Sequence, residues 1–354
     1  MIRLGDAATY INGYAFKPKD RGKKGLPIIR IQDLTGNAYD LGFYDGEYPE
    51  KIEVNDGDVL ISWSASLGVY VWNRGKALLN QHIFKVAFDK VEIDRNYFVY
   101  AVRYKLAEMG MKTHGATMKH IVKKDFDATQ IPYPSLKKQV EISNNLDKIL
   151  KIIEARKTEL FLLDNLIKAR FVEMFGDESN PLRWDVVNVE DVATVQVGVV
   201  IKPAQYYTDA ANGVRAFRSL NIGPMNIKDN DWVYFSEEGN NKNAKSLLKE
   251  NDLLIVRSGA PGTACVVTKQ YAGCNAIDII IAHPDMNKVN PYYLCAYTNF
   301  PHGKRQIDEG TGGAAQQHFN VGKYNKLQLM LPPIEKQDEF VVFIEQVDKS
   351  RVTD

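Results

Sequence analysis

The sequence contains no apolar run of the roughly 18 residues that a membrane-spanning helix needs. Its first ten residues, MIRLGDAATY, do not place a cationic segment before an apolar one, as a secretory signal would. Cysteine is scarce: Cys265, Cys274 and Cys295 are odd in number and match no zinc-binding spacing. We therefore expect a cytoplasmic protein, without a membrane segment and without a metal site, whose thiols are free and buried.

Charge of one sign is also lacking. The 354 residues carry 45 Lys and Arg against 44 Asp and Glu, a net charge of +1. This balance argues against a strongly basic nucleic-acid binder but leaves local basic patches open. The length corresponds to about two or three domains.

Recognisable catalytic motifs are absent as well. The segment GAPGTAC (259–265) lacks the Gly-Lys-Ser/Thr ending of a phosphate-binding loop, and neither a G-x-G-x-x-G nor an H-E-x-x-H pattern occurs. The segments IPYP (131–134) and LPPI (331–334) differ from the Asp/Asn-Pro-Pro-aromatic loop of an amino-methyltransferase. We expect a chain that is not catalytic by itself and carries no cofactor, although an enzyme of unrecognised chemistry stays open.

What the sequence does contain is a long-range repeat. The segment IPYPSLKKQVEI (131–142) returns as LMLPPIEKQDEF (329–340), and the start LGDAATYINGYAFKP (4–18) returns as VEDVATVQVGVVIKP (189–203). Between them, three more pairs of segments match in the same order: LPIIRIQDL with VRAFRSLNI, VNDGDVLISWSASLG (54–68) with KENDLLIVRSGAPG (249–262), and GATMKHI (115–121) with GAAQQHF (313–319). A period this long indicates a duplicated domain rather than a solenoid.

Each half has the pattern of a mixed α/β domain. Short β-branched runs separated by Gly, Asn and Asp predict strands and turns. Residues 97–110 have helical spacing and stop at Gly110, and residues 291–300 take the same place in the second half.

A different segment lies between the halves. Residues 137–175 contain neither glycine nor proline, with Ser135 as a predicted N-cap and Gly176 as a predicted C-cap. At about 1.5 Å per residue they would form a helix of roughly 58 Å. Apolar residues at alternating steps of four and three predict a heptad seam along it, typical of a helix that packs along another helix: Ile142, Leu146, Ile149, Ile153, Leu160, Leu163, Ile167 and Met174. The alternative is a helix that lies on a domain surface.

A second, shorter helix is predicted after Pro332 and Pro333, where Phe340, Ile344 and Val347 begin a matching seam. The predicted fold class is therefore α+β: two globular mixed α/β domains arranged as a pseudo-repeat, separated by a long central coiled-coil helix and followed by a shorter C-terminal helix. The predicted boundaries are 1–134, 135–178, 179–333 and 334–354.

The polar residues of the two halves favour binding. Asn, Gln, Lys and Arg read base edges of DNA, while Lys, Arg, Ser and Thr hold phosphates. These polar residues also have a simpler interpretation, because a run of charges is usually a solvated loop and a single histidine is usually structural. We predict DNA contacts at Lys17, Lys19, Arg30, Ser62, Ser64, Asn80, Gln81, His114, Lys119, His120, Lys202, Arg218, Asn221, Arg257, Ser258, Asn275, Thr311, Gln316, Gln317 and His318.

This organisation resembles the DNA-specificity subunits of type I restriction–modification enzymes over essentially the whole chain. The stretch EARKTELFLLDNLIKARFVEMFGD (154–177) is similar to the central conserved helix of that family. NGYAF (12–16), NDGDVLIS (55–62) and ENDLLIVRSG (250–259) resemble recurring segments of its target-recognition domains.

The resemblance implies that each domain reads one half of a bipartite double-stranded DNA target, while the helices set the spacing and dock methyltransferase subunits. Those subunits would bring S-adenosylmethionine and methylate adenine, and a motor-nuclease subunit would cleave unmarked DNA. The second helix is shorter than is usual in the family, which leaves self-association through the helices open. The rival interpretation is a two-domain protein-interaction scaffold without DNA specificity.

Overall fold

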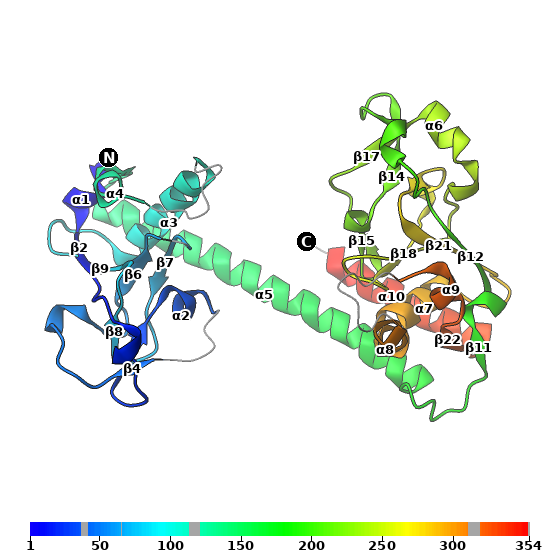
Figure 1. Ribbon diagram of the computed structural model, residues 1–354, viewed down its shortest axis with the longest axis horizontal. Coiled ribbons are helices and arrows are strands. Elements are labelled where there is room, and N and C mark those ends of the chain that lie inside the picture. Colours follow the sequence, from blue (N-terminus) through cyan, green and yellow to red (C-terminus); the bar gives the residue numbers. More distant parts are fainter. Residues whose placement is uncertain (37–41, 65, 113–120, 311–318, 353–354) are drawn as a thin grey trace. The chain divides into compact units, whose positions relative to one another are not determined.

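The computed structural model describes residues 1–36, 42–64, 66–112, 121–310 and 319–352 (Figure 1). The chain divides into two compact units, Met1–Ala155 (the first unit) and Arg156–Asp354 (the second unit). One helix of 40 residues, α5 (Leu136–Phe175), supplies its N-terminal half to the first unit and its C-terminal half to the second.

The first unit contains two four-stranded sheets. One is antiparallel, in the order β2 (Thr9–Asn12), β9 (Ile83–Ala87), β6 (Val59–Ser62) and β7 (Gly68–Val71). The other has the order β4 (Phe43–Tyr44), β3 (Leu26–Ile29), β8 (Ala77–Leu79) and β5 (Glu53–Val54), with β3 and β8 parallel. A short pair, β1 (Ile2–Arg3) and β10 (Gln130–Ile131), joins the two ends of the domain.

Helices cover the first of these sheets. They are α1 (Leu4–Ala7), α3 (Arg95–Lys112) and α4 (Lys123–Ala128), while α2 (Ile31–Thr35) follows β3. Phe98, Val102 and Phe126 from α3 and α4 pack with Ile61 and Phe84 of the sheet into one hydrophobic core. All four residues of β6 are buried, as expected of a central strand that carries a continuous apolar run.

The second unit repeats this design. Its antiparallel sheet has the order β12 (Ala193–Val197), β21 (Ile279–Pro284), β18 (Leu253–Val256) and β19 (Ala264–Val266). Its other four-stranded sheet has the order β13 (Tyr207–Thr208), β17 (Val233–Ser236), β14 (Gly213–Phe217) and β20 (Asn275–Ala276), with β14 and β20 parallel. Two short pairs complete it: β11 (Val186–Asn188) with β22 (Gln328–Met330), and β15 (Ile222–Gly223) with β16 (Asn226–Ile227).

The helices of the second unit are α6 (Glu237–Lys242), α7 (Pro291–Asn299), α8 (Pro301–Gly310), α9 (Val321–Asn325) and α10 (Ile334–Val352). The main sheets of the two units have the same topology, and the parallel pair of strands in the other sheet recurs. In both units the last short strand is followed by a long helix. The predicted duplication of a mixed α/β domain is therefore confirmed, as are the long helix between the domains and the shorter helix after them.

The repeated Lys-Gln segment joins each long helix to its domain. The Gln139 side chain is buried, accepts a 2.9 Å bond from the Asp94 backbone N–H and donates a 2.8 Å bond to the Pro134 carbonyl. Gln337 makes the matching bonds, each of 2.8 Å, to the Asn290 N–H and the Pro332 carbonyl. Asp94 also caps α3 and Asn290 caps α7, so one glutamine in each unit fixes the start of two helices.

The ends of α5 lie close to where the sequence predicts them. The Ser135 carbonyl accepts the N–H groups of Lys138 and Gln139 in the first turn. Gly176 follows the last helical residue with a φ of +86°, the left-handed conformation that glycine adopts without a steric penalty.

The buried face of α5 differs from the predicted seam. Phe171 and Phe175, which the heptad pattern omits, are fully buried among Tyr293, Phe300 and Phe340. They continue from Ile167 at steps of four, because here the helix packs onto a globular core as well as onto a second helix. Of the predicted seam, Ile167 is buried, Leu163 and Met174 are partly buried against that core, Ile142 and Leu146 are half-buried, and Ile149, Ile153 and Leu160 are exposed.

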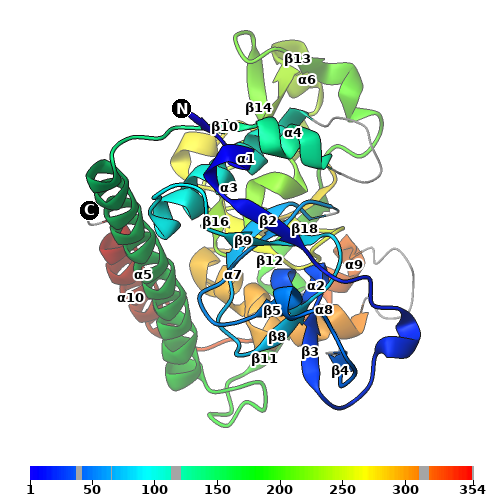
Figure 2. The ribbon, with the colours of Figure 1, turned by 90° about the vertical axis from the view of Figure 1, so that its left-hand side faces the viewer.

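Helix α10 runs antiparallel beside the C-terminal half of α5 (Figure 2). Near one end Arg170 pairs with Glu339 at 3.3 Å. Near the other end Arg351 pairs with Asp164 at 2.5 Å, and its carbonyl accepts a 2.6 Å bond from Arg156. Phe340, Ile344 and Val347, the predicted start of the second seam, are buried in the same core.

Candidate nucleic-acid interface

Backbone hydrogen bonds gather four separate segments at one end of the main sheet of the first unit, where β2 and β6 end and β9 begins. Tyr14 donates to the Leu79 carbonyl at 2.9 Å, and Gln81 donates to the Tyr14 carbonyl at 2.9 Å. Trp63 donates to the His82 carbonyl at 3.3 Å, and Ile121 donates to the Trp63 carbonyl at 3.0 Å. We call these residues the first rim: Gly13, Tyr14, Trp63, Asn80, Gln81, His82 and Ile121.

Three of these four bonds recur in the second unit. Val199 donates to the Ala276 carbonyl at 2.8 Å, Asp278 donates to the Val199 carbonyl at 3.1 Å, and Phe319 donates to the Arg257 carbonyl at 3.0 Å. We call these residues the second rim: Gly198, Val199, Arg257, Ile277, Asp278 and Phe319. The matching bonds make Arg257 the equivalent of Trp63, and Ile277 the equivalent of Asn80. The two rims therefore share a backbone frame and differ in side chains.

Both frames depend on a glycine at the end of the first strand of the sheet. A Cβ atom at Gly13 would lie 2.0 Å from the Asn80 carbonyl oxygen, and one at Gly198 would lie 2.2 Å from the Ala276 carbonyl oxygen. Neither position has room for a side chain, because the clashing atom belongs to the backbone of the neighbouring strand.

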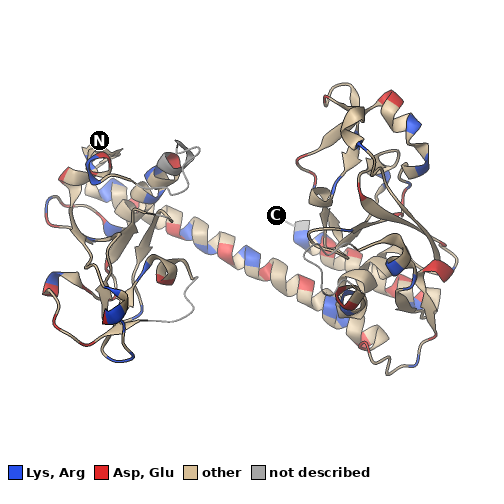
Figure 3. Ribbon diagram, in the orientation of Figure 1, with Lys and Arg blue, Asp and Glu red and all other residues tan. Residues whose placement is uncertain are grey.

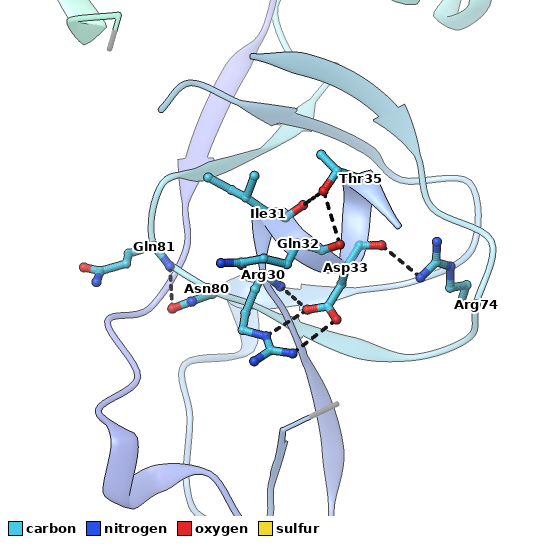
Figure 4. A network of polar contacts seen from close by, with 8 residues as sticks. All are labelled: Arg30, Ile31, Gln32, Asp33, Thr35, Arg74, Asn80 and Gln81. Atoms are coloured by element: carbon cyan, nitrogen blue, oxygen red, sulfur yellow. Dashed lines mark hydrogen bonds and ion pairs between the residues drawn. The ribbon is translucent and has the colours of Figure 1, made fainter. Parts of the chain in front are cut away.

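Polar groups surround the first rim. Arg30 Nε pairs with Asp33 at 3.1 Å, and the Arg30 backbone N–H donates to the same carboxylate at 2.8 Å, which caps α2 (Figure 4). Arg74 donates to the Asp33 carbonyl at 3.0 Å. The Asn80 side-chain oxygen accepts the Gln81 N–H at 2.9 Å, while the Gln81 side chain extends away from this network and is exposed (Figure 4).

The second unit has the counterpart of this cap. The Arg218 backbone N–H donates to the Asn221 side-chain oxygen at 2.9 Å, and the Arg218 guanidinium donates to the Asp231 carbonyl. Arg30 and Arg218, which the sequence pairs, thus occupy equivalent positions beside their rims. Each is half-buried and already has partners in its own unit.

The predicted contact residues fall into three groups. The first lies at or beside the rims: Arg30, Ser64, Asn80, Gln81, Arg218, Arg257 and Ser258 are exposed or half-buried there. Lys17, Lys19 and Lys202 belong to the segments that leave the rims after Gly13 and Gly198, and all three are exposed. Their exposure is compatible with the predicted contacts, which stay predictions.

The second group is buried. Ser62, Asn221 and Asn275 have no exposed side chain. The Ser62 hydroxyl donates to the Ser66 carbonyl, Asn221 donates to the Asn230 carbonyl at 2.7 Å, and Asn275 accepts from Ser246 at 2.8 Å. Their polar groups are engaged inside the protein, Ser62 and Asn221 with nearby backbone and Asn275 with the segment of Asn240 to Ser246, so the predicted DNA contacts of these three residues do not agree with their burial.

The third group lies outside the described residues: His114, Lys119, His120, Thr311, Gln316, Gln317 and His318. Ile121 and Phe319, which follow those segments, are bound to the two rims at Trp63 and Arg257. These seven residues stay predictions.

Sequence reasoning missed several residues of the rims. Asp278, which pairs with Arg257, belongs to no matched segment, and only the strand register shows its place. The glycines Gly13 and Gly198 already stand opposite each other in the first matched pair of segments, so their common role could have been inferred from that alignment.

Three further findings concern the described residues. Within the described ranges, no three His, Cys, Asp or Glu side chains are grouped so that they could hold a metal ion. None of the described helices is long and apolar enough to cross a lipid bilayer. All three cysteines are free and buried, which confirms that expectation.

Two domains of one topology, each with an equivalent rim at the end of its main sheet and each fixed to a long helix, define a recognition protein with two domains. The chain belongs to the family of type I restriction modification DNA specificity domains, whose model matches residues 1–161 and again residues 181–353. The resemblance noted in the sequence is thereby confirmed, and two repeated recognition domains fit a bipartite DNA target.

Known relatives cover most of the chain. The specificity subunit of the type I restriction enzyme EcoBI from Escherichia coli is 23% identical over 373 residues, covering 98% of this chain and 78% of that subunit. The MjaVIII specificity subunit from Methanocaldococcus jannaschii is 23% identical over 281 residues, covering 72% of this chain and 62% of its own.

Solved structures share the fold. The S subunit of a type I restriction-modification system from M. genitalium aligns with a TM-score of 0.58 at 12% identity, covering 99% of this chain and 89% of its own. A chain from a structure that describes complex assembly and conformational transition of the type I system aligns with a TM-score of 0.55 at 14% identity, covering 99% and 90%.

Proposed function

We propose that the first and second units each read one half of a split, asymmetric double-stranded DNA sequence through their rims. The observation that carries this proposal is the shared backbone frame with different side chains. The first rim presents amides, Asn80 and Gln81, where the second presents Ile277 and the Arg257–Asp278 pair. Amides and guanidinium groups prefer different bases, so two unlike half-sites follow.

Lysines near the rims supply the phosphate contacts in this proposal. Lys17 and Lys19 serve the first unit and Lys202 serves the second, since all are exposed and stand a few residues beyond the rim glycines. Phosphate contacts orient a protein on the duplex without reading its sequence. The net charge of +1 leaves few surplus cations, so partner subunits are needed for tight binding.

Helix α5 is the proposed docking surface for methyltransferase subunits. Between residues 149 and 166 it exposes large apolar side chains: Ile149, Leu150, Ile152, Ile153, Leu160, Phe161, Leu162 and Leu166. Positive and negative side chains alternate along the helix (Figure 3). The helix therefore has no long stretch of like charge that would repel a partner. An exposed apolar surface of this extent is typical of a protein interface.

Replacing Ile153 with glutamate tests this surface. Ile153 is 44% exposed, so the substitution should leave the fold intact while it places a charge in the interface. The matched control is Val140→Glu, which places the same charge at a 39% exposed apolar position of the same helix, outside residues 149–166. We expect loss of co-purification with the methyltransferase subunit for Ile153→Glu alone. Light scattering of the isolated chain tests the other occupant, a second copy of this chain.

In this proposal the chain catalyses nothing. The methyltransferase subunits bind S-adenosylmethionine and methylate adenine in the cytoplasm, and a motor-nuclease subunit cleaves DNA that lacks the mark. The chain contributes the sequence at which both activities take place.

The decisive experiment is co-expression with the companion methyltransferase subunit in a host without such systems, followed by genome-wide mapping of methyladenine. A methylated motif of two short half-sites with a fixed gap is the expected result. A soluble complex that methylates nothing would overturn the proposal and favour the protein-interaction scaffold.

A further inference from the structure

Arg257 occupies an unusual place in the second rim. It is the first residue after β18, and its side chain is 17% exposed. Its Nε donates to the Phe319 carbonyl at 3.3 Å, and its Nη1 donates to the Asp278 carboxylate. Asp278 itself is held in the turn before β21, where its backbone N–H is bound to the Val199 carbonyl at 3.1 Å.

These two bonds leave part of the guanidinium unused. A guanidinium carries five N–H groups in a planar fork. Two are engaged by Phe319 and Asp278, and within the described residues the remaining three have no hydrogen-bond partner. The side chain is therefore held in one orientation while it keeps donors for a ligand.

The equivalent residue of the first rim carries no guanidinium fork. Trp63 stacks on Phe84 with ring centroids 5.6 Å apart and contacts the His82 ring at 5.0 Å. Trp63 thus belongs to the packing of its own sheet. The two rims therefore differ at this position in both charge and hydrogen-bonding groups.

We propose that Arg257 reads a guanine in the half-site of the second unit, with Asp278 as its positioning residue. The proposal rests on the proposed function. An arginine fork matches the O6 and N7 acceptors of guanine in the major groove, and no other base presents two acceptors there. The carboxylate fixes the fork before DNA arrives, so less side-chain freedom is lost on binding.

The charge of the pair supports base reading over phosphate binding. Arg257 and Asp278 together are close to neutral, so they gain little from the phosphate backbone. A directional pair of hydrogen bonds to a base edge remains available to the fork. Lys202, which has no carboxylate partner among the described residues and is exposed, is better suited to a phosphate.

The test measures base preference in the complex with the methyltransferase subunit. Competition binding uses duplexes in which each position of the recognised motif is replaced by the other three base pairs. We expect Arg257→Gln to reduce the preference for guanine at one position by roughly 5- to 150-fold. Asp278→Asn should give a smaller loss at that same position. The other half-site should be unchanged by both.

The control is Arg215→Gln, which removes another cation of the second unit. Arg215 is 42% exposed and lies 3.7 Å from Asp229, so it resembles Arg257 in having an acidic partner. It should leave every base preference intact. Arg257→Lys keeps the charge but lacks the fork, so it should retain binding to random DNA and still lose the guanine preference.

A structural role for Arg257 predicts a different pattern. If Arg257→Gln and Arg257→Lys weaken all positions equally, or if neither changes any position, the inference is wrong. A wild-type complex that reads a split motif unaffected by these variants overturns the inference alone. A wild-type complex that reads no motif overturns the proposed function itself.

Discussion

Replacing Gln337 with methionine removes the side chain that fixes α10 to the second unit. The change keeps nearly the same length and volume, so it tests the hydrogen bonds rather than the packing. Gln337 is fully buried, accepts from the Asn290 N–H and donates to the Pro332 carbonyl, both at 2.8 Å. A third bond of 3.3 Å reaches the Lys288 carbonyl.

The expected loss follows from the groups left unpaired. Two backbone groups lose their main partner inside the protein, and a buried polar group without one costs about 1–3 kcal/mol. Lys288 is exposed, so water can replace its bond. We therefore expect Gln337→Met to lower the free energy of unfolding of the second unit by about 2–6 kcal/mol.

Urea denaturation followed by tryptophan fluorescence measures this loss. Trp184 and Trp232 report on the second unit, and Trp63 and Trp72 report on the first. With a slope of about 2–3 kcal/mol per molar urea, the midpoint of the second unit's transition should fall by about 0.7–3 M, while that of the first unit stays unchanged.

The control is Gln346→Met, at an exposed position of α10. The sister variant, Gln139→Met, should lower the first transition instead. The reasoning would be refuted if Gln337→Met proved no less stable than Gln346→Met, because the repeated glutamine would then not join helix to domain.

The thiols should resist modification, since burial raises the pKa of Cys265 to about 12 and that of Cys274 to about 11. At pH 8 a disulfide reagent should detect no thiol in the folded chain and all three cysteines after unfolding, and fast labelling of folded protein would contradict this. Gly198→Ala should lower the free energy of unfolding by roughly 3 kcal/mol because its Cβ would clash with the backbone. Gly322→Ala, whose Cβ would meet nothing closer than 3.5 Å, should lower it far less when both variants are measured by urea denaturation. Binding of the isolated chain to DNA should be weak and should fall steeply between 50 and 200 mM salt, and tight binding of random DNA at physiological salt would contradict the neutral charge balance.

Local pattern was enough to predict the duplication and the long helix. The helix α5 begins and ends within a residue of its predicted range, because glycine and proline are absent inside it and Gly176 ends it. The buried face of α5 could not be predicted from local pattern. Phe171 and Phe175 face a globular core, and nothing in the sequence near them says which partner will lie against the helix.

The candidate site shows the same limit. Asn80, Gln81 and Arg257 could be selected from residue type and from the repeat, and they do lie at the rims. Asn221 and Asn275 have the same chemical types but are buried. Burial is decided by strand order and loop closure, which bring together residues far apart in the sequence. Residue type alone therefore cannot distinguish a residue that contacts DNA from one that stabilises a loop.

The rims are held together by main-chain bonds, and this has a consequence for how such a protein can change through evolution. Every residue type except proline has both an amide N–H and a carbonyl, so Trp63, Asn80, Arg257 and Ile277 can be exchanged for any residue but proline without loss of the bonds that set their places. Point mutations at these positions change the side chains of the rims while the backbone frame that holds them persists. A lineage can thereby acquire a new target in single steps, each passing through a folded protein.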